Sequence, residues 1–277
     1  MTTPDAGSPD TATSADAATT AGRPSRPTRT GRTRRRRPAL RITLVAIAAA
    51  LIAAVSAFLV DAHVTFSAER APVQAVADDL AVHTRWSYPS VVMTPGDDST
   101  GAGLVFFAGA KVDPLAYADK LRGLVDGGTT VVIIRPPLNY AIFEWRPFSD
   151  FSALAPEVTE WFVGGHSLGG VKACQYAHDP AVAGLVLLGS YCAGDESGLG
   201  KPVVSVSGSN DGLSTPAKIE ASRASLPSDT VFVEIEGANH AQFGDYGVQP
   251  GDGVSTIDDE RMRAQLTAAL QQVIPTR

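Results

Sequence analysis

The sequence predicts an α/β fold, a doubly wound and mostly parallel sheet covered by helices on both faces, preceded by one membrane-spanning helix. Three observations lead to this prediction. From about residue 89 onward, short apolar runs rich in Val and Ile alternate with segments of helical composition, as in parallel sheets buried on both faces. A serine flanked by glycines separates one such strand from the next helix. Finally, an uncharged apolar run of 19 residues lies near the N-terminus.

The first 41 residues are predicted to be a disordered, basic, cytoplasmic tail. They carry a net charge of +6, which leaves −12 on the rest of the chain. Residues 1–31 are rich in Thr, Ala, Pro, Ser, Asp and Gly and have no apolar periodicity. Such a segment cannot bury enough surface to offset the entropy of ordering. A basic tail therefore precedes an acidic body.

Residues 42–60 are predicted to form a transmembrane helix. As a helix the run would rise about 28 Å, close to the thickness of a hydrocarbon core of roughly 30 Å. Four arginines, Arg34 to Arg37, precede it and should stay in the cytoplasm, which places the rest of the chain outside. The arginines have a topological role there, so nucleic acid is not an expected partner.

A cleaved signal peptide is the alternative for this run, and it would make the protein secreted. Small-residue cleavage sites are present at Val55-Ser56-Ala57 and Val60-Asp61-Ala62. The apolar run is long for a signal peptide, which favours an uncleaved anchor.

Residues 61–88 are expected to be a linker, and residues 89–277 a single α/β domain. Strands are expected at 90–93, 104–107, 130–134, 160–163, 182–188, 203–206 and 231–235, and helices at 114–125, after 167, at 216–226 and at 260–274. Ligands in such sheets bind at the carboxyl ends of the strands, so residues that follow the strands are the candidates for chemistry.

The motif Gly165-His166-Ser167-Leu168-Gly169 lies where a strand turns into a helix, and Ser167 is the predicted nucleophile. A residue on so sharp a corner is expected to have positive φ, and the positions two before and two after it must be small. This geometry exposes the hydroxyl and leaves the Leu168 N–H free to bind an oxyanion.

An acid and a base follow two later strands, in the chain order Ser, Asp, His. Asp211 follows the 203–206 strand and His240 the 231–235 strand. His240 would take the serine proton, and Asp211 would orient the imidazole and stabilise its charged form. Asp195 is the alternative acid. His166 is expected to point away from the site.

A second oxyanion donor is expected from the loop after the 104–107 strand. The Ala110 N–H is the first candidate there and the Gly109 N–H the second, while Lys111 is expected to pair with Asp113.

Cys174 and Cys192 are the only cysteines. They are read as unpaired core residues in preference to a disulfide. No spacing of Cys and His suggests a metal site, and no cofactor is expected.

These motifs resemble those of the α/β-hydrolase fold, and more narrowly those of the lidless "alpha/beta hydrolase family 5" group related to dienelactone hydrolases. The resemblance covers residues 89–275. It rests on the sequences at 103–114, 163–170, 208–212 and 237–247. It implies Ser167, Asp211 and His240 as a catalytic triad. One departure is Ala108-Gly109-Ala110, where the family carries Pro-Gly-Gly.

The predicted function is that of a membrane-anchored serine hydrolase cleaving a small-molecule carboxylic ester or thioester through an acyl-enzyme. The alternatives are a non-catalytic surface protein that binds a ligand or partner on the same fold, and a peptidase. Only residues 189–202 join two strands where a cap is commonly inserted, so a minimal cap is expected. Without a lid there is little apolar wall for a long acyl chain, which predicts a preference for short acyl esters.

Overall fold

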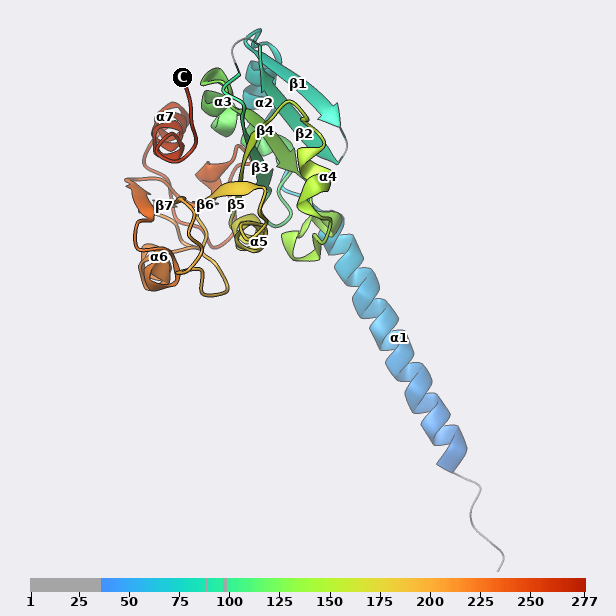
Figure 1. The fold of residues 1–277 in the computed structure, drawn as a ribbon. Coiled ribbons are helices and arrows are strands. Elements are labelled where there is room, and N and C mark those ends of the chain that lie inside the picture. Colours follow the sequence, from blue (N-terminus) through green and yellow to red (C-terminus); the bar gives the residue numbers. More distant parts are fainter. Residues whose placement is uncertain (1–35, 88, 97–98) are drawn as a thin grey trace, which may run out of the picture. The chain divides into compact units, whose positions relative to one another are not determined.

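The computed structural model describes residues 36–87, 89–96 and 99–277. Its core is an eight-stranded sheet with the order β1-β2-β4-β3-β5-β6-β7-β8 (Figure 1). The strands are β1 Val82–Ser87, β2 Ser90–Pro95, β3 Ala102–Phe107, β4 Thr130–Ile134, β5 Glu160–His166, β6 Val182–Leu188, β7 Val203–Gly208 and β8 Val231–Ile235. Strands β3 to β8 are parallel, and β2 is antiparallel to both of its neighbours.

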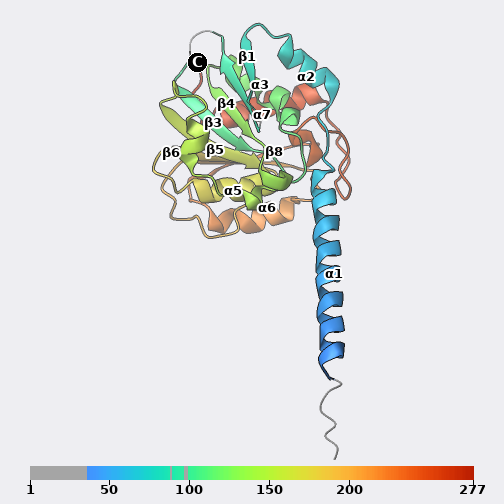
Figure 2. The same ribbon diagram turned by 90° about the vertical axis from the view of Figure 1, so that its right-hand side faces the viewer.

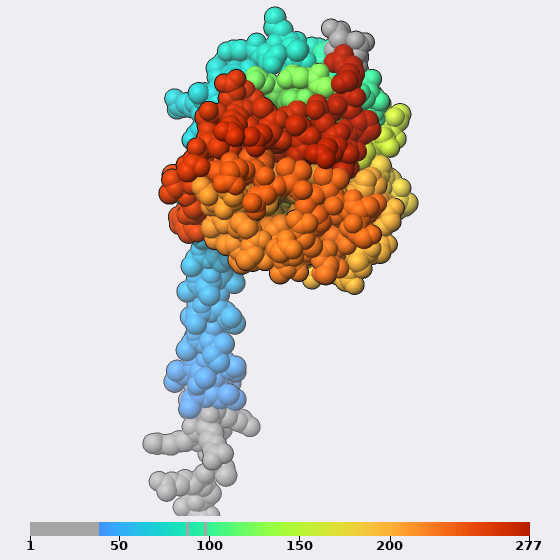
Figure 3. Space-filling model, turned by 90° about the vertical axis from the view of Figure 1, so that its left-hand side faces the viewer, coloured from blue at the N-terminus to red at the C-terminus, as the bar shows by residue number. Residues whose placement is uncertain are grey.

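Helices cover both faces of the sheet, as predicted. One face carries α2 (Arg70–Ala77), α3 (Ala118–Asp126) and α7 (Asp259–Leu270), and the other carries α5 (Leu168–Tyr176) and α6 (Pro216–Ser222) (Figure 2). The face drawn in Figure 3 is formed largely by the orange and red part of the chain, which includes β7, α6, β8 and α7.

Side chains along β3 alternate between the two faces of the sheet, which explains why helices must cover both faces. Leu104 and Phe106 belong to the core on the α3 and α7 side, whereas Val105 and Phe107 belong to the core on the α5 side. All four side chains are fully buried. Successive side chains of a strand point to opposite faces, so a strand that is apolar at every position must be covered twice.

The N-terminal helix α1 runs from Arg36 to His63. Its segment Ala39–His63 is long and apolar enough to cross a membrane, and the protein buries none of the hydrophobic window. The helix thus begins before residue 42, inside the stretch predicted to be disordered; residues 1–35 of that stretch lie outside the described residues. The chain divides into two compact units between Leu51 and Ile52, so the last turns of α1 belong to the globular unit.

Residues 61–88, expected to be a linker, contribute ordered elements to the globular unit. Strand β1 pairs with β2 from Val82 to Ser87, and Val76 of α2 joins the core. Phe66 forms an isolated parallel bridge with Val112. The sequence favours a linker here because an edge strand, covered on one face only, carries a weaker apolar signal than a central strand.

The two cysteines are joined, which corrects the sequence-based reading. A disulfide connects Cys174, in α5, with Cys192, in the loop after β6. The two cysteines are 18 residues apart. They had been expected to stay unpaired because one lies in the helix after Ser167 and the other follows the next strand. In the fold, α5 packs on β5 and β6, which brings the second half of the helix beside the carboxyl end of β6.

Shorter elements complete the domain: the helical turns η1 Pro114–Tyr117, η2 Pro137–Asn139, η3 Ala141–Phe143, η4 Arg223–Ser225 and η5 Ala241–Phe243, and helix α4 Phe148–Ser152. Residues 189–202 contain neither a helix nor a strand. The expected minimal cap is therefore what the structure has at this connection.

Candidate active site

Ser167 occupies the corner between β5 and α5 with φ of 52° and ψ of −123°. A non-glycine residue with positive φ is uncommon and costs roughly 1–3 kcal/mol. The corner is tight because a side chain at Gly165 would overlap the backbone of Gly169, and one at Gly169 would overlap the backbone of Phe107. The chain therefore presents Ser167 in the strained conformation that the motif predicts.

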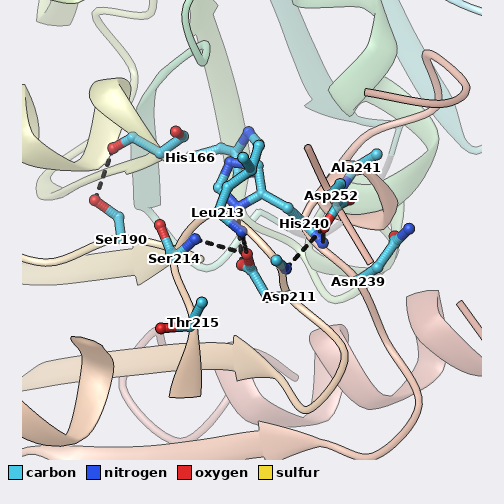
Figure 4. A network of polar contacts seen from close by, with 12 residues as sticks. His166, Ser190, Asp211, Leu213, Ser214, Thr215, Asn239, His240, Ala241 and Asp252 are labelled. Atoms are coloured by element: carbon cyan, nitrogen blue, oxygen red, sulfur yellow. Dashed lines mark hydrogen bonds and ion pairs between the residues drawn. The ribbon is translucent and has the colours of Figure 1, made fainter. Parts of the chain in front are cut away.

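Asp211 and His240 form a buried pair at the carboxyl ends of β7 and β8. The His240 Nδ1 donates to Asp211 Oδ2 over 2.8 Å, and both side chains are almost fully buried (Figure 4). The other carboxylate oxygen of Asp211 accepts the N–H groups of Leu213 and Ser214 at 2.8 and 2.7 Å. With Nδ1 occupied in this way, Nε2 of His240 is the nitrogen left to accept a proton.

Asp252 ties the loop of Asp211 to the loop of His240, and the sequence reading missed it. Its carboxylate accepts the N–H groups of Gly212, His240 and Ala241 at 3.0, 3.1 and 2.8 Å. Three hydrogen bonds to one carboxylate fix two loops that are far apart in sequence. No local motif marks such a residue, because its partners come together only in the fold.

Gly189 packs directly against this pair at the end of β6. Its φ is +48°, and a Cβ there would lie 3.1 Å from Asp211 Oδ2 and 3.2 Å from His240 Nδ1. Any side chain at this position would press on the hydrogen bond between the acid and the base.

Ser167 borders a hollow of about 240 Å³. The hollow is lined by Ser167, Leu168, Val171, Ser190, Tyr191, Leu213 and Ser214. The Ser190 hydroxyl donates to the Ser167 carbonyl oxygen over 2.7 Å. The structure does not join the Ser167 hydroxyl to His240, whose Nε2 is buried without a hydrogen-bond partner. A serine hydroxyl rotates freely about χ1, and such bonds are often long or unformed without substrate.

The candidate oxyanion donors differ in availability. Within the described ranges, neither the Leu168 N–H nor the Ala110 N–H has a hydrogen-bond partner. The Gly109 N–H, by contrast, donates to the Tyr117 hydroxyl over 3.0 Å. In this structure the Gly109 N–H, the second candidate, is therefore engaged, whereas the N–H of Ala110, the first candidate, is open to a ligand.

Comparisons with known proteins agree with this fold. The model of a family described as "Alpha/beta hydrolase family" matches residues 103–264, which is more than half of the chain. The chain belongs to the alpha/beta hydrolase family. Among curated proteins, none matches this sequence significantly.

The solved structures that resemble this alpha/beta hydrolase include two with the following similarity. A predicted CIB-like hydrolase from Thermoplasma acidophilum shares 15% identity with a TM-score of 0.50, over 70% of this chain and 100% of that one. The esterase domain of a Rhodothermus marinus protein shares 14% identity with a TM-score of 0.51, over 70% of this chain and 98% of that one. At such identities the likeness concerns the fold. Family and fold together support a hydrolytic enzyme.

His166 lies against the site of this hydrolase, contrary to the expectation that it points away. Its ring packs on that of His240 with 4.4 Å between centroids. Since Tyr117 Oη accepts the Gly109 N–H, its own hydrogen goes to His166 Nδ1, 3.0 Å away. Burial, with the nearby His240, holds the pKa of His166 well below its usual value of 6.5. A neutral ring there adds no charge to repel an imidazolium on His240.

The remaining candidates lie elsewhere. Asp195 is exposed, and its carboxylate caps the Ser197 N–H, so it is not an acid partner of His240. His178 pairs with Glu196 over 2.6 Å. Lys111 pairs with Asp61 rather than with Asp113, which pairs with Arg135. In the part of the chain that the structure describes, no group of three His, Cys, Asp or Glu could hold a metal ion.

Proposed function

We propose that this alpha/beta hydrolase is a serine hydrolase that cleaves a carboxylic ester or thioester through an acyl-enzyme. The observation that carries the proposal is the strained Ser167 corner, which borders a hollow and lies at the same sheet edge as the buried Asp211–His240 pair. A serine on a strained backbone corner that borders a hollow, together with an oriented imidazole, has the composition of a covalent catalytic site.

In the proposed reaction, His240 Nε2 accepts the Ser167 proton as Oγ attacks the acyl carbon. The Leu168 and Ala110 N–H groups would bind the oxyanion. The imidazolium then protonates the leaving alcohol or thiol, and Asp211 stabilises the charge that His240 carries in between. Water, activated by His240, attacks the acyl-enzyme in the second half and releases the acid. The side chains and the two N–H groups on which this reaction depends all belong to residues that the structure describes.

We further propose that α1 anchors the domain to a membrane, with the domain outside the cytoplasm. The apolar span and the arginines before it support this topology, and the disulfide is of a kind that persists in oxidising compartments. An uncleaved helix is favoured because Ala62 is fully buried and its carbonyl accepts a hydrogen bond from Asn139 over 2.8 Å. Cleavage after Ala62 would remove this buried residue, with its hydrogen bond to Asn139, from the mature domain.

The test uses a fluorophosphonate probe, which reacts with activated serines, on the full chain. Wild type should be labelled, whereas Ser167→Ala should not. Ser197→Ala is the matched control, because Ser197 lies in the loop after β6 but is exposed and outside the hollow, so the nucleophile should still be labelled. A wild-type protein that stays unlabelled and hydrolyses no ester would point to a binding protein instead, and label that persists in Ser167→Ala would move the nucleophile.

A further inference from the structure

The loops that follow β3 and β4 hold the end of α1. Lys111 Nζ forms an ion pair with Asp61 Oδ1 at 2.8 Å, and Asn139 Nδ2 donates to the Ala62 carbonyl over 2.8 Å. On the helix itself, the Phe58 ring stacks on that of Tyr140 with 6.0 Å between centroids. The helix end is thus fixed to these loops by an ion pair, a hydrogen bond and an aromatic contact.

These loops lie at the same sheet edge as the candidate catalytic residues. Strands β3 and β4 are parallel to β5, β7 and β8, and carboxyl ends of parallel strands meet at one edge. The apolar run ends at Val60, and Asp61, the next residue, already contacts Lys111. No linker separates the end of the apolar run from this contact, so the loops at the carboxyl edge of the sheet adjoin the last residues of α1.

Most of the exposed apolar side chains outside α1 lie along this edge. Outside α1, the described residues include seven large apolar side chains that are more than half exposed: Val64, Leu80, Trp86, Ile142, Trp145, Val248 and Val254. Six of them lie at the carboxyl ends of strands or in loops at that edge, and only Leu80 lies at the opposite edge, beside the end of β2. Trp145 is 75% exposed, and Trp is enriched where proteins meet the membrane interface.

The hollow beside Ser167 is too small to enclose a long acyl chain. Its volume of about 240 Å³ falls below the range of typical ligand pockets, roughly 300–1,000 Å³. No lid adds to it, because residues 189–202 form no helix or strand. A long chain left in water would forgo about 0.8 kcal/mol for each methylene. A bilayer against the same edge would supply the apolar surroundings that the protein lacks.

The charges near the span favour a neutral lipid. Lys111, Arg135 and Arg146, the cations around the end of α1, are each paired with a carboxylate, from Asp61, Asp113 and Glu144 respectively. These three cations are therefore already neutralised and give little attraction for an anionic headgroup.

We propose that the catalytic edge faces the bilayer that holds α1, and that the substrate is a neutral acyl ester resident in that bilayer, such as a glyceride. The reacting carbonyl enters the hollow while the acyl chain stays in the lipid. This inference rests on the proposed hydrolase function and on the anchor. It also confines the predicted preference for short acyl chains to esters that are presented from water.

The experiment places the full chain in phosphatidylcholine vesicles and compares two substrates. Dioleoylglycerol is supplied either in the same bilayer as the enzyme or in separate vesicles, and p-nitrophenyl acetate is supplied in water. Glyceride in the same bilayer should be cleaved at least about tenfold faster than glyceride in separate vesicles, because a shared bilayer raises the effective concentration. The Ser167→Ala variant provides the blank for every arm.

A spacer variant tests the orientation. A flexible Gly/Ser segment of about 20 residues between Val60 and Asp61, with an average span of about 25 Å, would leave the body tethered but free to turn. Glyceride cleavage in the same bilayer should fall about fivefold or more, while acetate cleavage stays within about twofold. The same segment inserted between Gly22 and Arg23 is the control.

A second test replaces exposed apolar side chains. The double variant Trp145→Ser with Ile142→Ser should also lower glyceride cleavage, whereas Leu80→Ser, at the opposite edge, should not.

The outcomes separate the two proposals. Acetate cleavage without glyceride cleavage, or equal glyceride rates in the spacer variant and its control, would overturn the membrane-facing edge and leave the hydrolase proposal intact. Failure to cleave either substrate, in every arm, would contradict both.

Discussion

At the scale of single residues, the site combines strain with burial. Ser167 is held at positive φ on a partly buried corner, whereas Asp211 and His240 are shut away from solvent. The small serine side chain contributes little packing, so its replacement by alanine should leave the fold intact. The buried pair is held by hydrogen bonds from Leu213 and Ser214, as well as by Asp252, so its geometry is set before substrate arrives.

The first prediction concerns the acid and the base. His240→Ala should lower kcat for an ester about 10⁶-fold, as should Ser167→Ala, whereas Asp211→Asn should lower it about 10⁴-fold, because Asp211 orients and does not react. Steady-state kinetics, with circular dichroism as a check on folding, measures this series. Asp195→Asn is the control and should stay near wild type; if it were the more damaging acid change, the acid would be misassigned.

The second prediction concerns His166 and pH. The rings of Tyr117, His240, Phe243 and Tyr246 surround it, and its folded pKa lies below the ordinary 6.5. The unfolded chain therefore binds the proton first as pH falls. The stability from neutral His166 is complete above about pH 6.5 and is lost below it, by up to about 1.4 kcal/mol per pH unit.

Urea unfolding of His166→Gln between pH 7 and 5 tests this, since Gln keeps an acceptor for Tyr117 and cannot titrate. Its stability should fall less steeply than that of wild type, and the exposed control His83→Gln should keep the wild-type slope. Equal slopes for wild type and His166→Gln would contradict a depressed pKa.

Candidate roles could be predicted for residues that lie in a recognisable local motif, and not for residues whose contacts depend on the fold. Ser167, Asp211 and His240 could be proposed from the sequence because each follows a strand within a short glycine-containing motif. His166 was misplaced because ring contacts with His240 depend on the packing of β5 against the loop after β8. Gly109 was ranked without knowing that Tyr117, eight residues later, turns back to accept its N–H.

At the scale of elements, the central strands were predicted closely, because apolar runs covered on both faces leave a strong signal. The observed bounds of β4, β6 and β8 equal the predicted ones. Edge strand β1 was missed, since its exposed face carries His83 and Arg85, and one-sided strands have weaker patterns. The disulfide was also missed, because pairing depends on how α5 crosses β6.

The third prediction concerns that disulfide. Removing it through Cys174→Ala with Cys192→Ala should lower the free energy of unfolding by about 3 kcal/mol, because a loop of this length is no longer closed in the unfolded chain. Urea denaturation with and without reductant measures the loss. The double variant should be insensitive to reductant. Alkylation of both thiols in native, unreduced protein would show that the bond is absent.

At the scale of the whole molecule, a basic N-terminal stretch, an apolar helix and an acidic body follow one another along the chain. This order predicts topology. A C-terminal alkaline phosphatase should be active, and a fluorescent protein that matures only in the cytoplasm should stay dark. Mass analysis of the mature protein should find the N-terminal tail retained. A start near Phe58 or His63, or fluorescence at the C-terminus, would contradict the anchored topology.

The disulfide also bears on when, after synthesis, the hollow beside Ser167 takes its final shape. It ties the helix that begins behind Ser167 to the loop that carries Ser190 and Tyr191, two walls of the hollow. Such a bond forms only where an oxidant is available. In the proposed topology, the hollow would therefore acquire its final shape only after the domain has crossed the membrane. A newly made chain would pass through the cell interior with its serine in a loosely framed pocket. The esters of the cytoplasm would thus be spared from a hydrolase that is completed only at its destination.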